Sequence, residues 1–264
     1  MMASRADDRS APSLVPSLVI EASTYRATVA VVQGSVVLAH ARVAMRGEHE
    51  ERLMPAVADV LAAVGVSVRD LARVICGSGP GSFTSLRIAA ALAKGLCAGA
   101  TEAPRLGAVS SLELIVAGAI DRLSSGCYWA SLDALRGERY AALISVILPD
   151  VSASAPARVE PPIHSGGGGG NGAPSQTAPQ PVRRIQWDGS WGRVPTAELI
   201  DRAERAHVPM IGPDDALEAW PDAAGVIHVW DDVAEAEPVS WEPSYGRLAE
   251  AEVRRAARLM SASQ

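Results

Sequence analysis

The sequence has few cysteines. Cys76, Cys97 and Cys127 lie far apart, and no Cys-x-x-Cys pair occurs. A zinc site built on paired cysteines therefore has no support. Apolar residues surround all three, which predicts buried free thiols in a reducing compartment.

The sequence also lacks a long uninterrupted apolar run. Arg87, Lys94 and Glu113 interrupt the apolar helical segments, so no segment is expected to span a membrane. Residues 1–16 carry two aspartates and only a broken apolar stretch, which does not resemble a signal peptide. A cytoplasmic location is the prediction.

An excess of basic residues is missing as well. The 264 residues include 24 Lys and Arg against 30 Asp and Glu, which gives a net charge of -6. Nucleic-acid backbones are bound through clustered Lys and Arg, so any contact with nucleic acid is expected to be indirect. The length and a hydrophobic content of 48% are enough for one large domain or two lobes with separate cores.

The most informative segment is a glycine-rich turn, which joins an apolar strand to a helix. Residues 76–96 read CGSGPGSFTSLRIAAALAKGL, so the backbone turns sharply and is bare of side chains. Ser82 or Thr84 is expected to cap the helix. Backbone N–H groups at such a start suit an anion or a close-packed partner, so Gly79, Gly81, Ser82 and Thr84 are candidates for anion or nucleotide contact. No Gly-Lys-Ser/Thr follows, so the turn is not a P-loop.

Apolar periodicity predicts an alternating order of strands and helices along the rest of the chain. Strands are expected at 18–22, 26–32, 36–43, 73–76, 106–109, 127–133, 139–148, 183–187 and 208–211, and helices at 48–64, 82–100, 110–123 and 196–206. The helices at 110–123 and 196–206 are expected to have side-chain caps, which Ser110 and Ser111 would supply in the first. The section around Trp230 and Trp241 is expected to be irregular.

One internal segment differs in composition from everything else. Residues 151–181 are rich in Ser, Ala and Pro and contain five consecutive glycines. Such a segment cannot bury enough apolar surface to order itself, so a flexible insertion is expected.

The glycine-rich turn, with Phe83, Leu86, Arg87 and Lys94 in register, resembles the signature of the TsaB (YeaZ) family. These bacterial proteins have the sugar kinase/Hsp70/actin-like fold and help build threonylcarbamoyl-adenosine in tRNA. Residues 133–140 and 243–247 resemble two further family segments, the first more loosely.

The resemblance implies an α/β protein with a two-lobed actin-like fold, in which mixed sheets are flanked by helices. Residues 17–108 would form the first lobe, and a C-terminal helix at 247–262 would pack back on it. Residues 109–246 would form a smaller second lobe that carries the flexible insertion at 151–181.

The resemblance also implies a non-catalytic scaffold in tRNA threonylcarbamoylation. Its partners would be a TsaD-like catalytic subunit and a TsaE-like ATPase, or a second copy when the chain is alone. No cofactor is firmly implied, although ATP or ADP could lie at the interface of the complex. The residues expected to contact the partner are Leu53, Val57, Leu61, Ile88, Ala90, Ala91 and Lys94.

Two positions bear on whether the chain has chemistry of its own. The family usually has Asp-Thr-Ser where this chain has Glu21, and a longer carboxylate suits magnesium less well. A solvated or capping Glu at a strand end is therefore favoured. The paralogue TsaD holds its metal with two histidines spaced i, i+4, whereas His49 here is followed at that spacing by Leu53.

Two other functions stay open beside the scaffold. The first is an independent actin-like ATPase or small-molecule kinase that uses residues 79–84 for phosphate. Arg87 and Lys94 would either reach an anion at that turn or face water. The second is a metal-dependent peptidase, for which the sequence offers no ligand set.

Overall fold

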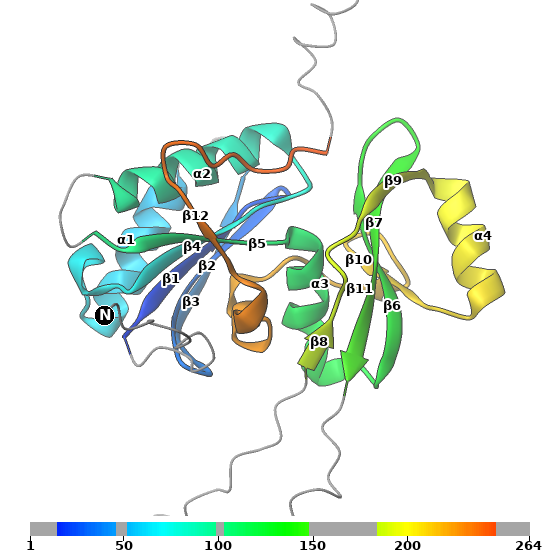
Figure 1. Ribbon diagram of the computed structural model, residues 1–264, viewed down its shortest axis with the longest axis horizontal. Helices are drawn as coiled ribbons and strands as arrows, with labels where there is room; N and C mark the ends of the chain where they lie inside the picture. The colour runs from blue at the N-terminus through cyan, green and yellow to red at the C-terminus, as the bar shows by residue number, and fades with distance from the viewer. Residues whose placement is uncertain (1–14, 46–51, 99–102, 148–183, 247–264) are drawn as a thin grey trace, which may run out of the picture.

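The computed structural model describes residues 15–45, 52–98, 103–147 and 184–246. These residues form two six-stranded mixed sheets with helices on their faces (Figure 1). The α/β class and the mixed sheets expected from the sequence are therefore confirmed. The two sheets lie on either side of a central helical layer, and each carries further helices on its outer face.

The first sheet contains most of the N-terminal strands. Its inner strand β1 (Ser17–Glu21) is hydrogen-bonded to one neighbour in antiparallel and to the other in parallel fashion. The strand order is β12 (Ala234–Ala236), β5 (Arg105–Val109), β4 (Arg73–Gly77), β1, β2 (Arg26–Gln33) and β3 (Val36–Ala44).

The second sheet is built around an antiparallel pair, β6 and β7, in the C-terminal half of the chain. Its order is β11 (Leu217–Glu218), β10 (Met210–Gly212), β6 (Gly126–Asp133), β7 (Glu138–Ile147) and β8 (Arg184–Gln186), with β9 (Gly192–Pro195) also paired to β7.

Helices form the remaining layers. Helices α1 (Leu53–Val64) and α2 (Phe83–Cys97) cover the outer face of the first sheet, and α4 (Thr196–Ala206) covers part of the second. Helix α3 (Ser111–Ala119) lies between the sheets, together with the short 3₁₀ helices η5 (Ala223–His228) and η6 (Trp230–Asp232).

Alternation along the strands assigns each face of the first sheet to a different core. Leu18 and Ile20 belong to the cluster under α1 and α2, whereas Val19 belongs to the cluster around α3. That second cluster continues into the inner face of the second sheet through residues such as Leu132 and Ile144. Strand β1 is buried on both faces, which explains its apolar sequence.

The expected elements are found within a few residues of their predicted ends, with several corrections. The helix expected over 110–123 ends at Ala119, and a 3₁₀ turn, η3 (Ile120–Arg122), follows it. The section around Trp230 is not simply irregular, because it contains η5, η6 and β12. Cys76 and Cys97 are buried as expected, but Cys127 is exposed on β6.

The expected serine caps are also wrong. Ser82 and Ser110 do stand at the N-cap positions of α2 and α3, yet neither side chain makes a capping hydrogen bond. The Ser82 hydroxyl is paired with the Ser85 hydroxyl at 3.1 Å. Pro195 stands at the N-cap of α4 and gives no side-chain cap either.

Some predictions lie outside the described residues. They are the insertion at 151–181, the C-terminal helix at 247–262, and His49 with the first part of the helix expected at 48–64. The division of the lobes at residue 108 stays a prediction. The return of β12 to the first sheet places residues 234–236 beside β5. Among the helices of the described ranges, none is long and apolar enough to cross a membrane.

A buried carboxyl group lies in the central helical layer. Glu113 is only 2% exposed, in the first turn of α3. Burial, together with the charge of the neighbouring Asp232 and a hydrogen bond to it, raises the pKa of Glu113 to about 9. The folded protein therefore holds this carboxyl group protonated at neutral pH.

A Glu113→Gln variant should test this assignment through the pH dependence of stability. Because the folded protein binds a proton that the unfolded chain releases above about pH 4.5, wild-type stability falls as the pH rises from there toward 9. The neutral amide escapes this loss. We expect its Tm advantage over wild type to grow by several degrees between pH 5 and pH 8, measured by calorimetry. The control Glu237→Gln, at an exposed position, should keep the same difference at both pH values.

Candidate functional site

The glycine-rich turn connects β4 to α2 and lies where several segments meet. Gly79 has a φ of +83°, and the Gly79–Pro80 peptide bond is cis. The left-handed φ favours glycine at this position. The turn faces the residues after β1, the start of α3 and the segment near Ser244.

Several backbone N–H groups of the glycine-rich turn donate hydrogen bonds to the chain itself. The N–H of Ser78 donates to the carbonyl of Val109 at 2.7 Å, and that of Gly79 donates to the Ser111 hydroxyl at 3.1 Å. The N–H of Ser82 donates to the carbonyl of Ser23 at 2.7 Å. Two of the four residues predicted to contact an anion thus use their N–H groups inside the fold. Thr84 is exposed on the first turn of α2.

Close backbone approach explains two of the glycines. A Cβ atom on Gly81 would lie 2.2 Å from the Ser23 carbonyl oxygen and 2.6 Å from the Ser23 Cβ. A Cβ on Gly79 would lie 2.4 Å from the Ser244 carbonyl oxygen. The sequence left two uses open for the bare turn, an anion or a close-packed partner. The structure places the chain's own backbone against both glycines, which corresponds to close packing.

Glu21 is not solvated, which corrects one of the two alternatives favoured for it. It is fully buried at the end of β1 and accepts hydrogen bonds from the Ser23 N–H at 2.5 Å and the Ser111 hydroxyl at 2.8 Å. Burial raises the pKa of Glu21, although the bonds from Ser23 and Ser111 oppose that rise. A Cβ on Gly77 would lie 1.9 Å from the Glu21 Oε2, so the carboxyl group packs against the glycine turn.

The two basic residues of α2 do not reach the turn. Lys94 forms an ion pair with Glu242 at 2.7 Å. The Arg87 guanidinium lies 5.2 Å from the centre of the Phe83 ring. The Tyr245 ring also packs against Phe83, and the two ring centres are 4.6 Å apart. Lys94 and Phe83 therefore hold the C-terminal segment against α2.

The three segments that carry the family resemblance come together in space. The Ser244 N–H donates to the Ser78 carbonyl at 2.8 Å, which links the third segment to the glycine turn. The Tyr140 hydroxyl donates to the Tyr245 carbonyl at 3.3 Å, and Gly246 lies against the Tyr140 ring. Burial raises the pKa of Tyr245 to about 12, and its hydrogen bond to the Glu242 carboxylate contributes to the rise.

Several residues predicted to contact a partner are buried in the chain's own core. Leu53 and Val57 are 1% exposed, Ala90 is 4% and Leu61 is 7%. Leu53, Val57 and Leu61 belong to the apolar cluster between α1, α2 and the first sheet, because these are the positions of α1 that face the sheet. Ala91 is exposed, and Ile88 and Lys94 are half-buried. A contact with a partner would therefore use Ala91 and its exposed neighbours rather than the buried four.

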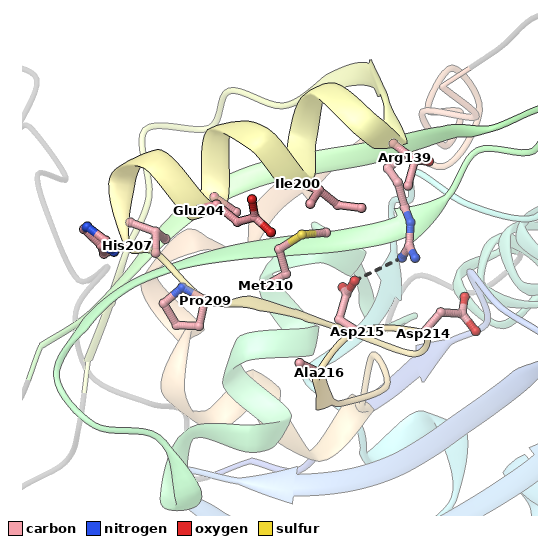
Figure 2. Close-up of a pocket in the computed structure, with 12 residues that line it drawn as sticks. Arg139, Ile200, Glu204, His207, Pro209, Met210, Asp214, Asp215 and Ala216 are labelled. Carbon is pink, nitrogen blue, oxygen red and sulfur yellow. Dashed lines mark ion pairs between the residues drawn. The ribbon is translucent and has the colours of Figure 1, made fainter.

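A second polar cluster, which sequence reasoning missed, lies on the outer face of the second sheet. The Ser131 hydroxyl donates to Asp215 Oδ2 at 2.6 Å and accepts from Arg139 at 3.1 Å. Arg139 also forms an ion pair with Asp215 at 3.3 Å, at the floor of a groove (Figure 2). Burial raises the pKa of Asp215, against the opposing effects of Ser131 and Arg139. Ser131 and Asp215 are 84 residues apart, so the spacing of residues in the sequence could not indicate that they meet.

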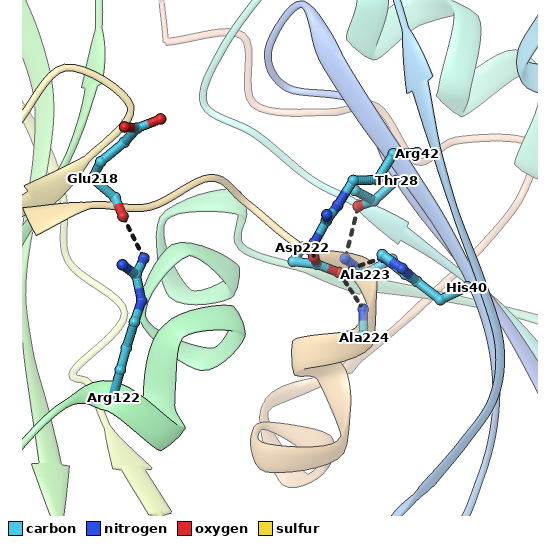
Figure 3. Close-up of polar contacts among 8 residues, drawn as sticks. All are labelled: Thr28, His40, Arg42, Arg122, Glu218, Asp222, Ala223 and Ala224. Carbon is cyan, nitrogen blue, oxygen red and sulfur yellow. Dashed lines mark hydrogen bonds and ion pairs between the residues drawn. The ribbon is translucent and has the colours of Figure 1, made fainter.

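A third polar cluster fastens the inter-sheet layer to the first sheet (Figure 3). His40 on β3 contacts Asp222 at 2.8 Å, and the Ala223 N–H donates to the Thr28 hydroxyl at 2.8 Å. Burial alone would raise the pKa of Asp222, but the bonds from His40 and the Ala224 N–H, with nearby positive charge, lower it. This cluster supports the fold, because its hydrogen bonds join the start of η5 to strands β2 and β3.

A protein-family model matches the middle of the chain. The family model described as "TsaD: tRNA N6-adenosine threonylcarbamoyltransferase" matches residues 41–155. The matched range includes α1, the glycine-rich turn, α3 and both strands of the β6–β7 pair.

Curated relatives match over a similar share of the chain. The tRNA threonylcarbamoyladenosine biosynthesis protein TsaB of Escherichia coli K12 is 38% identical over 123 residues, which are 47% of this chain and 52% of that protein. The protein of the same name from Bacillus subtilis 168 is 35% identical over 126 residues, or 48% and 53%. The chain thus spans about half the length of the curated relatives it matches. These relatives confirm the resemblance to TsaB.

A solved structure extends the likeness to nearly the whole fold. YeaZ from Pseudomonas aeruginosa matches with a TM-score of 0.59 at 19% identity, covering 87% of this chain and 99% of that chain. With its two mixed sheets and flanking helices, the chain therefore has the two-lobed actin-like fold expected from the sequence.

Replacing Gly81 by alanine should destabilise the protein, because the new methyl group would overlap the Ser23 backbone. We expect a loss of at least about 2 kcal/mol in the free energy of unfolding, measured by urea denaturation. The matched control is Gly95→Ala in the same segment, where nothing lies within 4 Å of the new Cβ. Helix propensity predicts a gain of about 0.5–1 kcal/mol there. Equal effects of the two substitutions would contradict the assignment of Gly81 to close packing.

Proposed function

We propose that the chain is an accessory subunit of the machinery that forms threonylcarbamoyl-adenosine in tRNA. The observation that carries this proposal is the 35–38% identity to two proteins named for that biosynthesis, over a segment that includes the glycine-rich turn. In this proposal the chain binds a TsaD-like catalytic subunit and positions it for transfer. It has no transfer activity of its own.

The packing of the glycine-rich turn supports a role without independent nucleotide chemistry. In this fold a bare turn after a strand could hold phosphate on free N–H groups. Here Gly79 and Ser82 donate within the chain, and the Ser23 backbone lies against Gly81. Glu21 stands where the family usually has an aspartate, and it is fully buried between Ser23 and Ser111.

The position that would complete a metal site also supports the accessory role. In the TsaD paralogue the resemblance places a second histidine four residues after the first. The corresponding residue here is Leu53, which is 1% exposed in the core under α1. A buried leucine offers no metal ligand.

The exposed sides of α1 and α2 are the proposed contact surface. Met54 is 52% exposed on α1, and Ala58 and Ala62 follow it at helical spacing. On α2 the exposed Ala91 lies between the half-buried Ile88 and the exposed Gly95. Small side chains allow another helix to approach closely, which suits a subunit interface.

The remaining partners are proposed on the same basis. A TsaE-like ATPase would be the third component, and the same helical surface would join two copies when the catalytic subunit is missing. A nucleotide would bind, if at all, where the subunits meet. The net charge of -6 favours indirect contact with tRNA. The cytoplasm is the proposed location.

An Ala91→Glu substitution should disrupt pairing without unfolding the chain. The new charge would lie on an exposed helical position that we propose to be buried by the partner. We expect loss of co-purification with the TsaD-like protein of the same organism and at least tenfold slower formation of threonylcarbamoyl-adenosine. The matched control is Ala197→Glu, on an exposed position of α4. Wild-type pairing by a folded Ala91→Glu variant would place the interface elsewhere, and wild type that neither pairs nor affects modification would refute the proposed function.

The isolated chain should show no saturable binding of ATP with magnesium at millimolar concentrations in isothermal titration calorimetry. The physical reason is that the N–H groups of Gly79 and Ser82 and the Glu21 carboxyl group form hydrogen bonds within the fold. Saturable binding that disappears when Gly81 is replaced would instead favour an actin-like ATPase or small-molecule kinase.

A further inference from the structure

The second sheet carries an open groove of about 780 Å³ between α4, strands β7 and β10, and the loop between β10 and β11. We call it the α4 groove, and Figure 2 shows most of its lining. Helix α4 buries Leu199 and Ala203 against the sheet, while Ile200 is 43% exposed. The Ile200 side chain points toward Met210 across the groove (Figure 2). The groove therefore has an apolar wall that nothing in the described part of the chain covers.

The apolar surface continues from the groove across the sheet. Met210 is the register partner of Trp129 on β6, and Trp129 is the partner of Leu143 on β7. Opposed residues of neighbouring strands share a face, so these three side chains lie in one row. Leu143 and Ile147, which are four residues apart on the same face of β7, are each 44% exposed. The row of three apolar side chains spans three neighbouring strands. It therefore offers room for several side chains of an extended or helical peptide segment.

The charges around the groove are mostly negative. Among its lining residues, Arg139 is the sole Arg or Lys, and it is paired with Asp215 at 3.3 Å. Glu204 and Asp214 are both exposed along the rim. Once Arg139 has neutralised Asp215, these two carboxylates leave a negative rim beside the apolar wall formed by Ile200 and Met210.

We propose that the α4 groove is a docking site for an apolar segment of a partner protein that carries Lys or Arg side chains. The apolar residues of the segment would cover Ile200, Met210 and Leu143, and its cations would meet Glu204 and Asp214. Charge complementarity selects this occupant, because negative rims repel phosphates and acidic peptides. The groove lies across the molecule from α1 and α2 (Figure 1), so this surface is separate from the one in the proposed function.

The test uses the full chain and a panel of fluorescein-labelled decapeptides made of Leu, Met and Lys in varied order. A second panel has Glu in place of each Lys. Fluorescence polarisation should show saturable binding for members of the Lys panel and none for the Glu panel. Glu204→Lys with Asp214→Lys should weaken binding at least tenfold, and so should Ile200→Asp. The matched control is Asp121→Lys, an exposed acid outside the groove lining, which should bind as wild type does.

Three outcomes would overturn the proposal. The first is no saturable binding of any Lys peptide to the wild-type chain. The second is equal binding of both panels, or an equal effect of the control and the groove variants. The third is a monomer–dimer equilibrium that Ile200→Asp abolishes in sedimentation velocity, since the occupant would then be a second copy. Far-ultraviolet circular dichroism checks that each variant is folded. If the charge-reversal variant does not fold, the neutral double variant Glu204→Gln with Asp214→Asn replaces it.

Discussion

The rest of the structure depends on the contact between the glycine-rich turn and the backbone around Ser23. Gly81 brings the chain to within van der Waals distance of that segment, and the Ser82 N–H completes the junction with a hydrogen bond. The carboxyl group of Glu21 fills the remaining space between the turn and α3. Because interiors are close-packed, this junction fixes where α2 and α3 leave the first sheet.

The glycine-rich turn also meets the two other segments that resemble the family. The turn, the segment around Tyr140 and the segment around Tyr245 are distant in sequence but meet at one place. Their shared constraint is packing of backbone and rings at close range, which tolerates few substitutions. A fold of this kind holds its lobes together through such contacts as well as through the polar cluster at Asp222.

Local pattern was sufficient to predict most elements, and the family resemblance supplied the fold class. Strand β1 is marked by its short apolar run, and helix α4 by the helical spacing of its apolar residues. The sequence could not show what lies against the turn. A glycine is needed there both for an anion and for the close approach of the Ser23 carbonyl. Periodicity also predicted that Leu53 and Val57 lie on the apolar face of a helix. It could not show that the first sheet, rather than a partner, covers that face. The Arg139–Asp215 cluster depends on residues paired across the sheet, for which one sequence gives no register.

The return of β12 to the edge of the first sheet has a consequence for synthesis of the chain. During translation the strands of that sheet up to β5 emerge first, but their last neighbour is encoded more than a hundred residues later. The Asp222 cluster that holds the layer behind β2 and β3 also emerges late. The N-terminal half therefore leaves the ribosome with an unpaired edge and an uncovered apolar face, and folding of the whole molecule waits for its C-terminal third.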